Sequence, residues 1–188
     1  MSNTIVRCPW CGDDPLYVKY HDEEWGKIVT EDRILFEFLV LESAQAGLSW
    51  ITILRKREGY RRLFADFDPT EVAQFTPEQI DMIVQDPAVI RHRGKIAATV
   101  TNAQVFLALQ QEFGSFYKYL YSFMPDQAPI RNKLISLKDA PTSTPESDAI
   151  AKDLKKRGVK FFGSTICYAF MQAVGMVNDH LDSCHFKN

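Results

Sequence analysis

The side chains best suited to metal chemistry lie at the two ends of the chain. Cys8 and His21 occur in the first segment, and His180 and Cys184 occur close to the C-terminus. The last two are four residues apart, which places them on one face if that segment is helical. Two thiolates and two imidazoles make the closed tetrahedral shell of a structural zinc ion. The sequence therefore predicts a zinc site that joins both ends of the chain.

Neighbouring residues leave other sets of metal ligands open. Cys11 forms a C-x-x-C pair with Cys8 and could supply the second N-terminal ligand, and His185 is a further candidate. The alternative is a group of unrelated buried thiols and surface histidines. Cys167 lies in an apolar run with no group that would lower its pKa, which indicates a core thiol.

A second candidate site centres on a glutamate in an apolar pattern. Apolar residues recur at helical spacing over residues 31–46, which predicts a helix. Phe38, Glu42 and Gln45 follow one another at steps of four and three, so Glu42 lies on the apolar stripe. A buried carboxylate is unfavourable unless it is paired or functional. Glu42 is thus a candidate binding group, and the alternative is a core glutamate with satisfied hydrogen bonds.

Aromatic residues can enclose a ligand beside this acid. Ser49 can cap a second helix that Trp50 opens. Tyr20, Trp25 and Trp50 can then converge on Glu42. Aromatic rings can sandwich a nucleobase, and they attract a cation by roughly 1–2 kcal/mol when it is desolvated. These residues predict a pocket for a flat, electron-poor ligand, with ordinary core packing as the alternative.

A basic segment suggests a nucleic-acid partner. Arg91, Arg93 and Lys95 lie between two predicted helices, and no acidic residue occurs from position 87 to position 111. A helix, a short hairpin and a second helix can hold a phosphate backbone with amides and local positive charge. The basic runs at 55–57 and 155–160 also favour a nucleic-acid partner. The net charge of the whole chain, −2, does not favour one. A solvated basic turn is the alternative.

The elements that position these residues are predicted to be helices. Residues 1–30 carry several proline and glycine breakers and are expected to be irregular. Capping signals and apolar spacing predict helices at residues 31–46, 50–64, 69–75, 77–84, 95–113, 116–123, 145–157 and 165–174, with a last turn or two at 177–184. Residues 126–144 are expected to form a loop. The predicted fold class is all-α.

Length and composition limit the classes of protein. A chain of 188 residues, 46% of them hydrophobic, suits one domain spanning residues 1–188. No apolar run is long enough to span a bilayer and no signal-peptide core occurs, so we expect a cytoplasmic protein. The sequence has no Ser-His-Asp pattern, phosphate-cradling glycine loop or dinucleotide fingerprint.

Several motifs together resemble one known family. They are residues 14–17, 20–26, 41–42, 45–50, 90–96 and 141–143, and the stretch from Cys167 to His180. With the predicted metal ligands they cover nearly the whole chain. On these motifs the sequence is similar to the bacterial 3-methyladenine-DNA glycosylase I family, a branch of the helix-hairpin-helix glycosylases.

The resemblance implies a fold, an activity and a metal site. The fold would be the helix-hairpin-helix glycosylase fold, with a lobe in which zinc joins residues 1–30 to residues 176–188. The enzyme would remove 3-methyladenine from alkylated double-stranded DNA and release the free base, without lyase activity, and would act as a monomer. The implied zinc ligands are Cys8, His21, His180 and Cys184, which leaves Cys11 outside the set.

The resemblance also implies roles for the other candidate residues. Glu42 and Tyr20 would hydrogen-bond the flipped base, Trp50 would stack on it and Trp25 would help to form the base pocket. Glu42 is the predicted catalytic group, because it favours a cationic base. The DNA contacts would come from Gly47 and Leu48, which press into the duplex, and from Arg91, Arg93, Gly94 and Lys95 of the hairpin. Many relatives carry a catalytic aspartate after the hairpin, and this sequence has none between Asp86 and Asp126.

Two other classes of function compete with the enzyme. One is a zinc-stabilised helical module that binds DNA without catalysis. The other is a zinc hydrolase, which requires an open position on the metal. Four protein ligands argue against the hydrolase.

Overall fold

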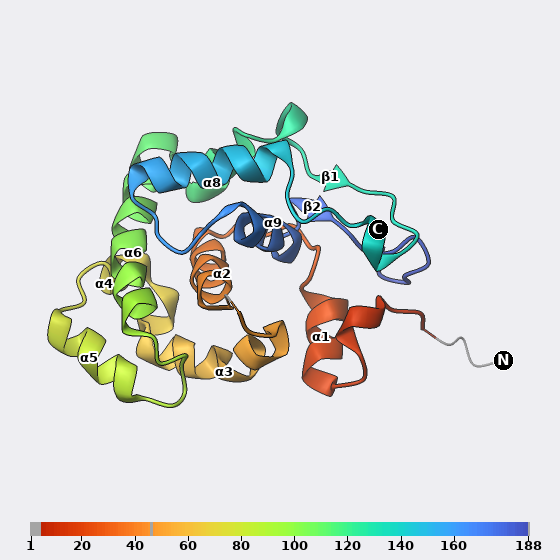
Figure 1. The fold of residues 1–188 in the computed structure, drawn as a ribbon. Helices are drawn as coiled ribbons and strands as arrows, with labels where there is room; N and C mark the ends of the chain where they lie inside the picture. The colour runs from red at the N-terminus through yellow and green to blue at the C-terminus, as the bar shows by residue number, and fades with distance from the viewer. Residues whose placement is uncertain (1–4, 46, 188) are drawn as a thin grey trace.

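The computed structural model describes residues 5–45 and 47–187. Within these ranges the chain is mostly helical (Figure 1). The α-helices are α1 (Pro15–Glu23), α2 (Asp32–Gln45), α3 (Trp50–Leu63), α4 (Pro69–Val72), α5 (Pro77–Gln85), α6 (Arg93–Phe113), α7 (Phe116–Tyr121), α8 (Pro145–Arg157) and α9 (Ser164–Ala173). Short 3₁₀ turns lie at Pro9–Cys11, Ala65–Phe67, Pro125–Gln127 and Leu137–Asp139. The predicted helical fold class is confirmed.

Local capping explains where several helices begin. Thr76 accepts a hydrogen bond from the backbone of Gln79, and the Gln79 side chain accepts one from the Thr76 backbone. Thr144 and Ser147 form the same reciprocal pair at the start of α8. Each cap satisfies backbone N–H groups that have no partner inside the helix, and proline follows at the first helical position. The predicted starts at residues 69, 77 and 145 are confirmed.

The expectation that residues 1–30 are irregular is wrong for α1. Asp14 accepts hydrogen bonds from the backbone N–H groups of Leu16 and Tyr17, and Pro15 occupies the first helical position. This is the same Asp-Pro signal that begins α4. The breakers on either side of α1 bound the helix and do not prevent it.

The expected helical turn over residues 177–184 is also wrong. Val177–Asn178 form the strand β2, which pairs in parallel with β1 (Ile130–Arg131) inside the predicted loop. The residues after β2 form turns. His180 and Cys184 therefore do not share a helical face, and their closeness in space depends on the path of this turn segment.

Helix α2 lies at the centre of the core. All residues from position 35 to position 44 are buried, including Glu37 and Glu42. Four helices pack around α2, namely α3, α6, α7 and α9 (Figure 1). This packing buries α2 on every side, whereas the sequence predicted a single buried stripe. The predicted last residue of this helix, Ala46, lies outside the described residues.

The two terminal segments lie on the same side of the molecule, next to α1 and the β1–β2 pair (Figure 1). The His185 amide donates to the Val6 carbonyl oxygen at 2.9 Å, which joins the segments directly. On the opposite side, residues 86–92 connect α5 to α6, as the predicted hairpin requires. No helix in the described ranges is long and apolar enough to cross a membrane.

Candidate active site and metal centre

A cavity of about 210 Å³ lies where α1, α2, α3 and α9 meet. Its lining combines aromatic rings with a few polar side chains, namely Trp10, Tyr17, Tyr20, Trp25, Glu42, Gln45, Trp50, Gln172 and Asp179, together with Leu137, Ala140 and Ala169. Apolar walls with few polar groups are typical of small-molecule sites. The four residues that sequence analysis placed around a ligand, Tyr20, Trp25, Glu42 and Trp50, all line this one cavity.

Glu42 is the acidic group at the α2 wall of this cavity and is 3% exposed. Burial raises the pKa of its carboxyl group to about 8, because a charge is poorly solvated there. Its Oε2 atom has no hydrogen-bond partner among the described residues. The indole Nε1 of Trp50 is buried and likewise lacks a partner in the described part of the chain. Such groups are unfavourable unless something else satisfies them, so the cavity is suited to a ligand with polar edges.

The aromatic residues form two connected groups. Tyr20 lies 5.6 Å from Trp50 between ring centroids, and Trp50 stacks against Phe38 at 6.4 Å. Trp10 bridges to Trp25 at 4.8 Å and to Tyr17 at 5.1 Å. Trp10 and Tyr17 were not among the predicted pocket residues. Both lie in the N-terminal segment, and Tyr17 belongs to the motif at residues 14–17.

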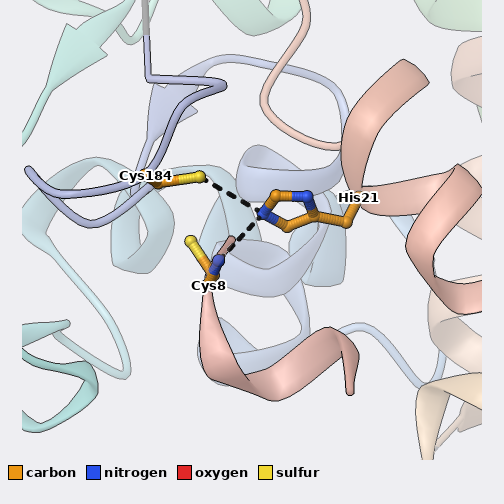
Figure 2. Close-up of side chains that lie close together, drawn as sticks. All are labelled: Cys8, His21 and Cys184. Carbon is orange, nitrogen blue, oxygen red and sulfur yellow. Dashed lines mark hydrogen bonds between the residues drawn. The ribbon is translucent and has the colours of Figure 1, made fainter. Parts of the chain in front are cut away.

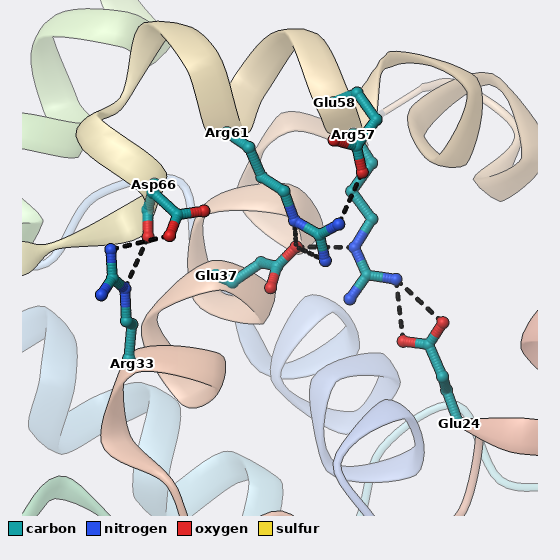
Figure 3. A network of polar contacts seen from close by, with 7 residues as sticks. All are labelled: Glu24, Arg33, Glu37, Arg57, Glu58, Arg61 and Asp66. Atoms are coloured by element: carbon teal, nitrogen blue, oxygen red, sulfur yellow. Dashed lines mark hydrogen bonds and ion pairs between the residues drawn. The ribbon is translucent and has the colours of Figure 1, made fainter.

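A network of charged groups holds together three of the helices that line the cavity, α1, α2 and α3 (Figure 3). Arg57 of α3 donates to Glu37 of α2 at 2.6 Å and to Glu24, at the end of α1, at 2.8 Å. The Arg57 guanidinium also lies over the Phe38 ring, 5.3 Å from its centroid. Arg61 donates to the same Glu37 oxygen at 3.1 Å. Arg57 is therefore not part of a solvent-facing basic patch, as the run at 55–57 suggested.

The predicted DNA-contacting residues lie on two neighbouring segments. Gly47 has a φ of +80° and Leu48 is 39% exposed, which suits a protruding turn between α2 and α3. In the hairpin, Arg91, Arg93 and Gly94 are exposed, and Arg93 pairs with Asp81 of α5 at 2.7 Å.

Lys95 is less exposed than the other hairpin residues. Its ammonium group donates to the Ala44 carbonyl oxygen at 3.1 Å, and partial burial lowers its pKa. Lys95 thus connects the two segments.

Three of the four predicted metal ligands come together at the chain ends (Figure 2). The ligand atoms of Cys8, His21 and Cys184 all lie within 4.8 Å of one another, and all three residues are buried. The Nδ1 atom of His21 lies 2.7 Å from Asp22, which leaves Nε2 directed toward the thiols. A carboxylate behind a histidine in this way commonly orients a metal ligand. This cluster can hold a metal ion.

His180 lies beside the cluster, 5.0 Å from His21 between ring centroids. Its Nδ1 atom lies 3.1 Å from the Asn178 side chain, and its buried Nε2 atom has no partner among the described residues. Burial lowers the pKa of this imidazole to about 4, so the ring is neutral and able to bind a metal.

The alternative ligands lie apart from this group. The Cys11 thiol donates to the Cys8 carbonyl oxygen at 3.2 Å, and His185 is exposed.

The chain is similar to known proteins over nearly its whole length. The sequence profile described as methyladenine glycosylase matches residues 10–188. The DNA-3-methyladenine glycosylase 1 of Escherichia coli is 51% identical over 180 residues, which cover 96% of each chain. This chain belongs to the methyladenine glycosylase family.

Solved structures of methyladenine glycosylases share the whole fold. A crystal structure of a 3-methyladenine DNA glycosylase I is 51% identical and superposes with a TM-score of 0.94 over 97% of this chain and all of that one. A tyrosine-to-phenylalanine variant of a 3-methyladenine DNA glycosylase I, solved in complex with 3-methyladenine, is 38% identical, with a TM-score of 0.93 over 97% of each chain. The fold expected from the resemblance is therefore confirmed.

One buried carboxylate of the cavity was not among the predicted site residues. Asp179 lines the cavity and accepts hydrogen bonds from Tyr168 at 2.7 Å, Gln172 at 2.8 Å and Asn132 at 2.7 Å. Its donors come from α9 and from the segment after β1, which are distant in sequence. Its place in the stretch from Cys167 to His180, directly before His180, was the available signal.

Proposed function

We propose that this protein hydrolyses the N-glycosidic bond of 3-methyladenine in alkylated double-stranded DNA and releases the free base during base-excision repair. The observation that carries the proposal is the aromatic cavity in which buried Glu42 Oε2 has no partner among the described residues. A flat base with hydrogen-bonding edges would satisfy this carboxyl group while its face lies against the Trp50 ring. The solved relative with bound 3-methyladenine supports this choice of ligand.

The flipped base would lie between aromatic walls, with Trp50 stacking on its face and Trp25 closing the pocket. Tyr20 and Glu42 would hydrogen-bond its edges. Taking the base out of the duplex costs a few kcal/mol, and the contacts in the pocket compensate for that cost. Because the cavity of about 210 Å³ is small, it suits a single base.

Charge would then select the damaged base. Methylation at N3 gives the adenine in DNA a positive charge and weakens its bond to C1′. A bound cation favours the charged form of buried Glu42, because opposite charges attract strongly where water is excluded, and the carboxylate then stabilises a cation more than it stabilises neutral adenine. Since the leaving group is already activated, selective binding can supply much of the catalysis.

The reaction itself would be a hydrolysis without a covalent enzyme intermediate. The C1′–N9 bond breaks and its electron pair neutralises the departing base. Oxygen from water bonds to C1′ and the water proton passes to solvent, which leaves an abasic site. With no Schiff base on Lys95, borohydride treatment with abasic DNA should trap no protein–DNA adduct.

Gly47 and Leu48 would press into the gap that the flipped base leaves. The exposed hairpin residues Arg91, Arg93 and Gly94 would hold phosphates of the same duplex. The Arg93–Asp81 ion pair lies at the surface, so it is weak enough to yield to a phosphate.

The metal would be one structural zinc ion held by Cys8, His21, Cys184 and His180. The three clustered ligand atoms and the unpartnered Nε2 of buried His180 fit this donor set. Two thiolates and two imidazoles are a common tetrahedral zinc shell, and four protein ligands leave no position for substrate. When bound, the ion would supply a cross-link between the chain ends, and catalysis would remain with the cavity residues.

The test is release of 3-methyladenine from methylated duplex DNA, resolved by chromatography, with zinc measured on the same sample. We expect one zinc per chain and release of free base. Binding to DNA without base release would favour the non-catalytic DNA-binding module.

A further inference from the structure

A surface groove of about 870 Å³ lies beside the hairpin and outside the base cavity. It runs between α8 and the segment that leads into α9. We call it the Phe161 groove, and its lining includes Lys152, Lys155, Lys160, Phe161 and Ser164. The proposed base chemistry uses none of these residues.

The groove carries uncompensated positive charge. Lys152, Lys155 and Lys160 form no ion pair with any residue in the described ranges. The acid in its lining, Asp148, accepts a hydrogen bond from the Ser164 hydroxyl. Three cations against one acid, in a chain whose net charge is −2, make a local site for a polyanion.

The Phe161 side chain lies exposed at the edge of this groove, next to a backbone that α6 holds in place. It is 44% exposed and its backbone has a φ of +58°, a conformation that bulky residues rarely adopt. Asn102 of α6 holds the preceding residue by two hydrogen bonds. Its amide donates to the Lys160 carbonyl oxygen at 3.0 Å, and its oxygen accepts from the Lys160 N–H at 2.9 Å. A strained backbone held in place around an exposed ring is a feature that often accompanies binding.

The groove and the hairpin form one continuous surface. The Phe161 ring meets the ring of His92 edge-on, with centroids 5.9 Å apart. It also approaches Gly94 so closely that a Cβ atom there would lie 3.8 Å from the ring. The hairpin and the groove are therefore neighbours on the surface and meet at Phe161.

We propose that the Phe161 groove is a second DNA-binding surface that holds the phosphate backbone next to the segment gripped by the hairpin. Lys155 and Lys160 contact successive phosphates, and the Phe161 ring packs against the deoxyribose between them. This inference rests on the proposed function, since it takes double-stranded DNA as the ligand.

The test compares two doubly substituted proteins that lose the same charge. One carries Lys155→Ala and Lys160→Ala in the groove, and the control carries Lys27→Ala and Lys118→Ala, which lie outside it. Affinity for a short undamaged duplex is measured over a series of salt concentrations, and affinity for free 3-methyladenine is measured by calorimetry. We expect the groove variant to bind duplex about tenfold more weakly and to lose about 2 from the slope of log affinity against log salt.

Free-base affinity and melting temperature should match those of the parent, because the groove is outside the cavity. A third protein carries Phe161→Asn. Asparagine readily adopts the positive φ found at this position, so the change removes the ring and keeps the backbone conformation. It should bind duplex more weakly with an unchanged salt slope.

Equal duplex affinity and salt slope in the groove variant and its control would overturn this inference. In that case base release by the parent protein shows that the proposed function still holds. A parent that neither binds duplex nor releases base would overturn both. Weakened binding to an acidic peptide but not to DNA would also count against the groove as a DNA site.

Discussion

The Lys95 ammonium group donates to the Ala44 carbonyl oxygen at 3.1 Å and so connects the start of α6 to the end of α2. Carbonyl groups in the last turn of a helix lack helical partners, and a cation there is favourable. The hairpin side chain that sequence analysis assigned to a phosphate thus has a structural partner in the protein. It holds the hairpin against the helix that leads into the turn at Gly47 and Leu48.

Lys95→Met should therefore disturb more than a phosphate contact. We expect the free energy of unfolding to fall by about 1–2 kcal/mol, because a charge-assisted hydrogen bond is lost. Duplex affinity should fall as well, with a smaller salt slope if the ammonium group also reaches a phosphate. Lys56→Met is the matched control, since Lys56 donates to the Pro87 carbonyl oxygen from an exposed position. Equal free energies of unfolding in the two variants would show that the Lys95–Ala44 hydrogen bond stabilises the protein no more than the exposed Lys56–Pro87 hydrogen bond.

Arg57→Met should lower stability by roughly 2–3 kcal/mol. The change leaves the buried Glu37 carboxylate with Arg61 alone and removes the partner of Glu24, and loss of one member of a buried ion pair is strongly unfavourable. The comparison is Arg62→Met, which breaks the exposed pair with Asp86 and should cost under about 1 kcal/mol. Denaturant unfolding of both proteins measures the difference. If the two variants lose the same stability, the Arg57 network contributes no more than an exposed ion pair.

Cys184→Ala should remove zinc and loosen the chain ends. Since metal binding contributes to folding, we expect a loss of several kcal/mol and less than one zinc per chain. Cys11→Ala is the control, because the Cys11 thiol bonds to a carbonyl oxygen and lies outside the cluster. Melting temperature and metal content report both effects. A Cys184→Ala protein that keeps its zinc and melts like the parent would refute this ligand set.

Local signals account for what the sequence predicted well. Asp or Thr before proline marks the starts of α4, α5 and α8, since the cap and the fixed proline φ act within a few residues. The same Asp-Pro signal occurs at Asp14. The prolines and glycines nearby indicated an irregular segment, so α1 was not predicted. The spacing of Glu42 within an apolar pattern correctly indicated its burial.

Long-range packing accounts for what the sequence could not provide. Val177 is in a strand because it pairs with Ile130, and Asp179 is satisfied by donors from distant segments. The run at 55–57 looked like a solvated basic patch, yet Arg57 is directed inward by acids of α1 and α2. None of these partners can be identified from spacing alone.

Glu42→Gln should change how stability depends on pH. The pKa of the unfolded carboxyl group is 4.5 and that of the folded one is about 8, because burial disfavours its charge. Between these values the unfolded state binds fewer protons than the folded state, so the stability of the parent falls as pH rises. The variant does not titrate there, so it should gain a few kcal/mol over the parent between about pH 5 and pH 8. A stability difference that stays constant across this window would mean that the Glu42 carboxyl titrates normally.

The same variant should also bind the damaged base more weakly. A glutamine side chain at this position keeps the shape of the glutamate and loses the charge, so stacking on Trp50 is preserved. We expect free 3-methyladenine to bind less tightly by about 1–3 kcal/mol, the usual scale for a hydrogen bond to a charged group. Affinity for undamaged duplex and zinc content should be unchanged, because Glu42 lies in the cavity and apart from the Cys8–His21–Cys184 cluster. Isothermal titration of parent and variant with the free base measures the effect. Equal affinities would show that the Glu42 carboxyl group contributes nothing to holding the released base, and that stacking on Trp50 accounts for its affinity.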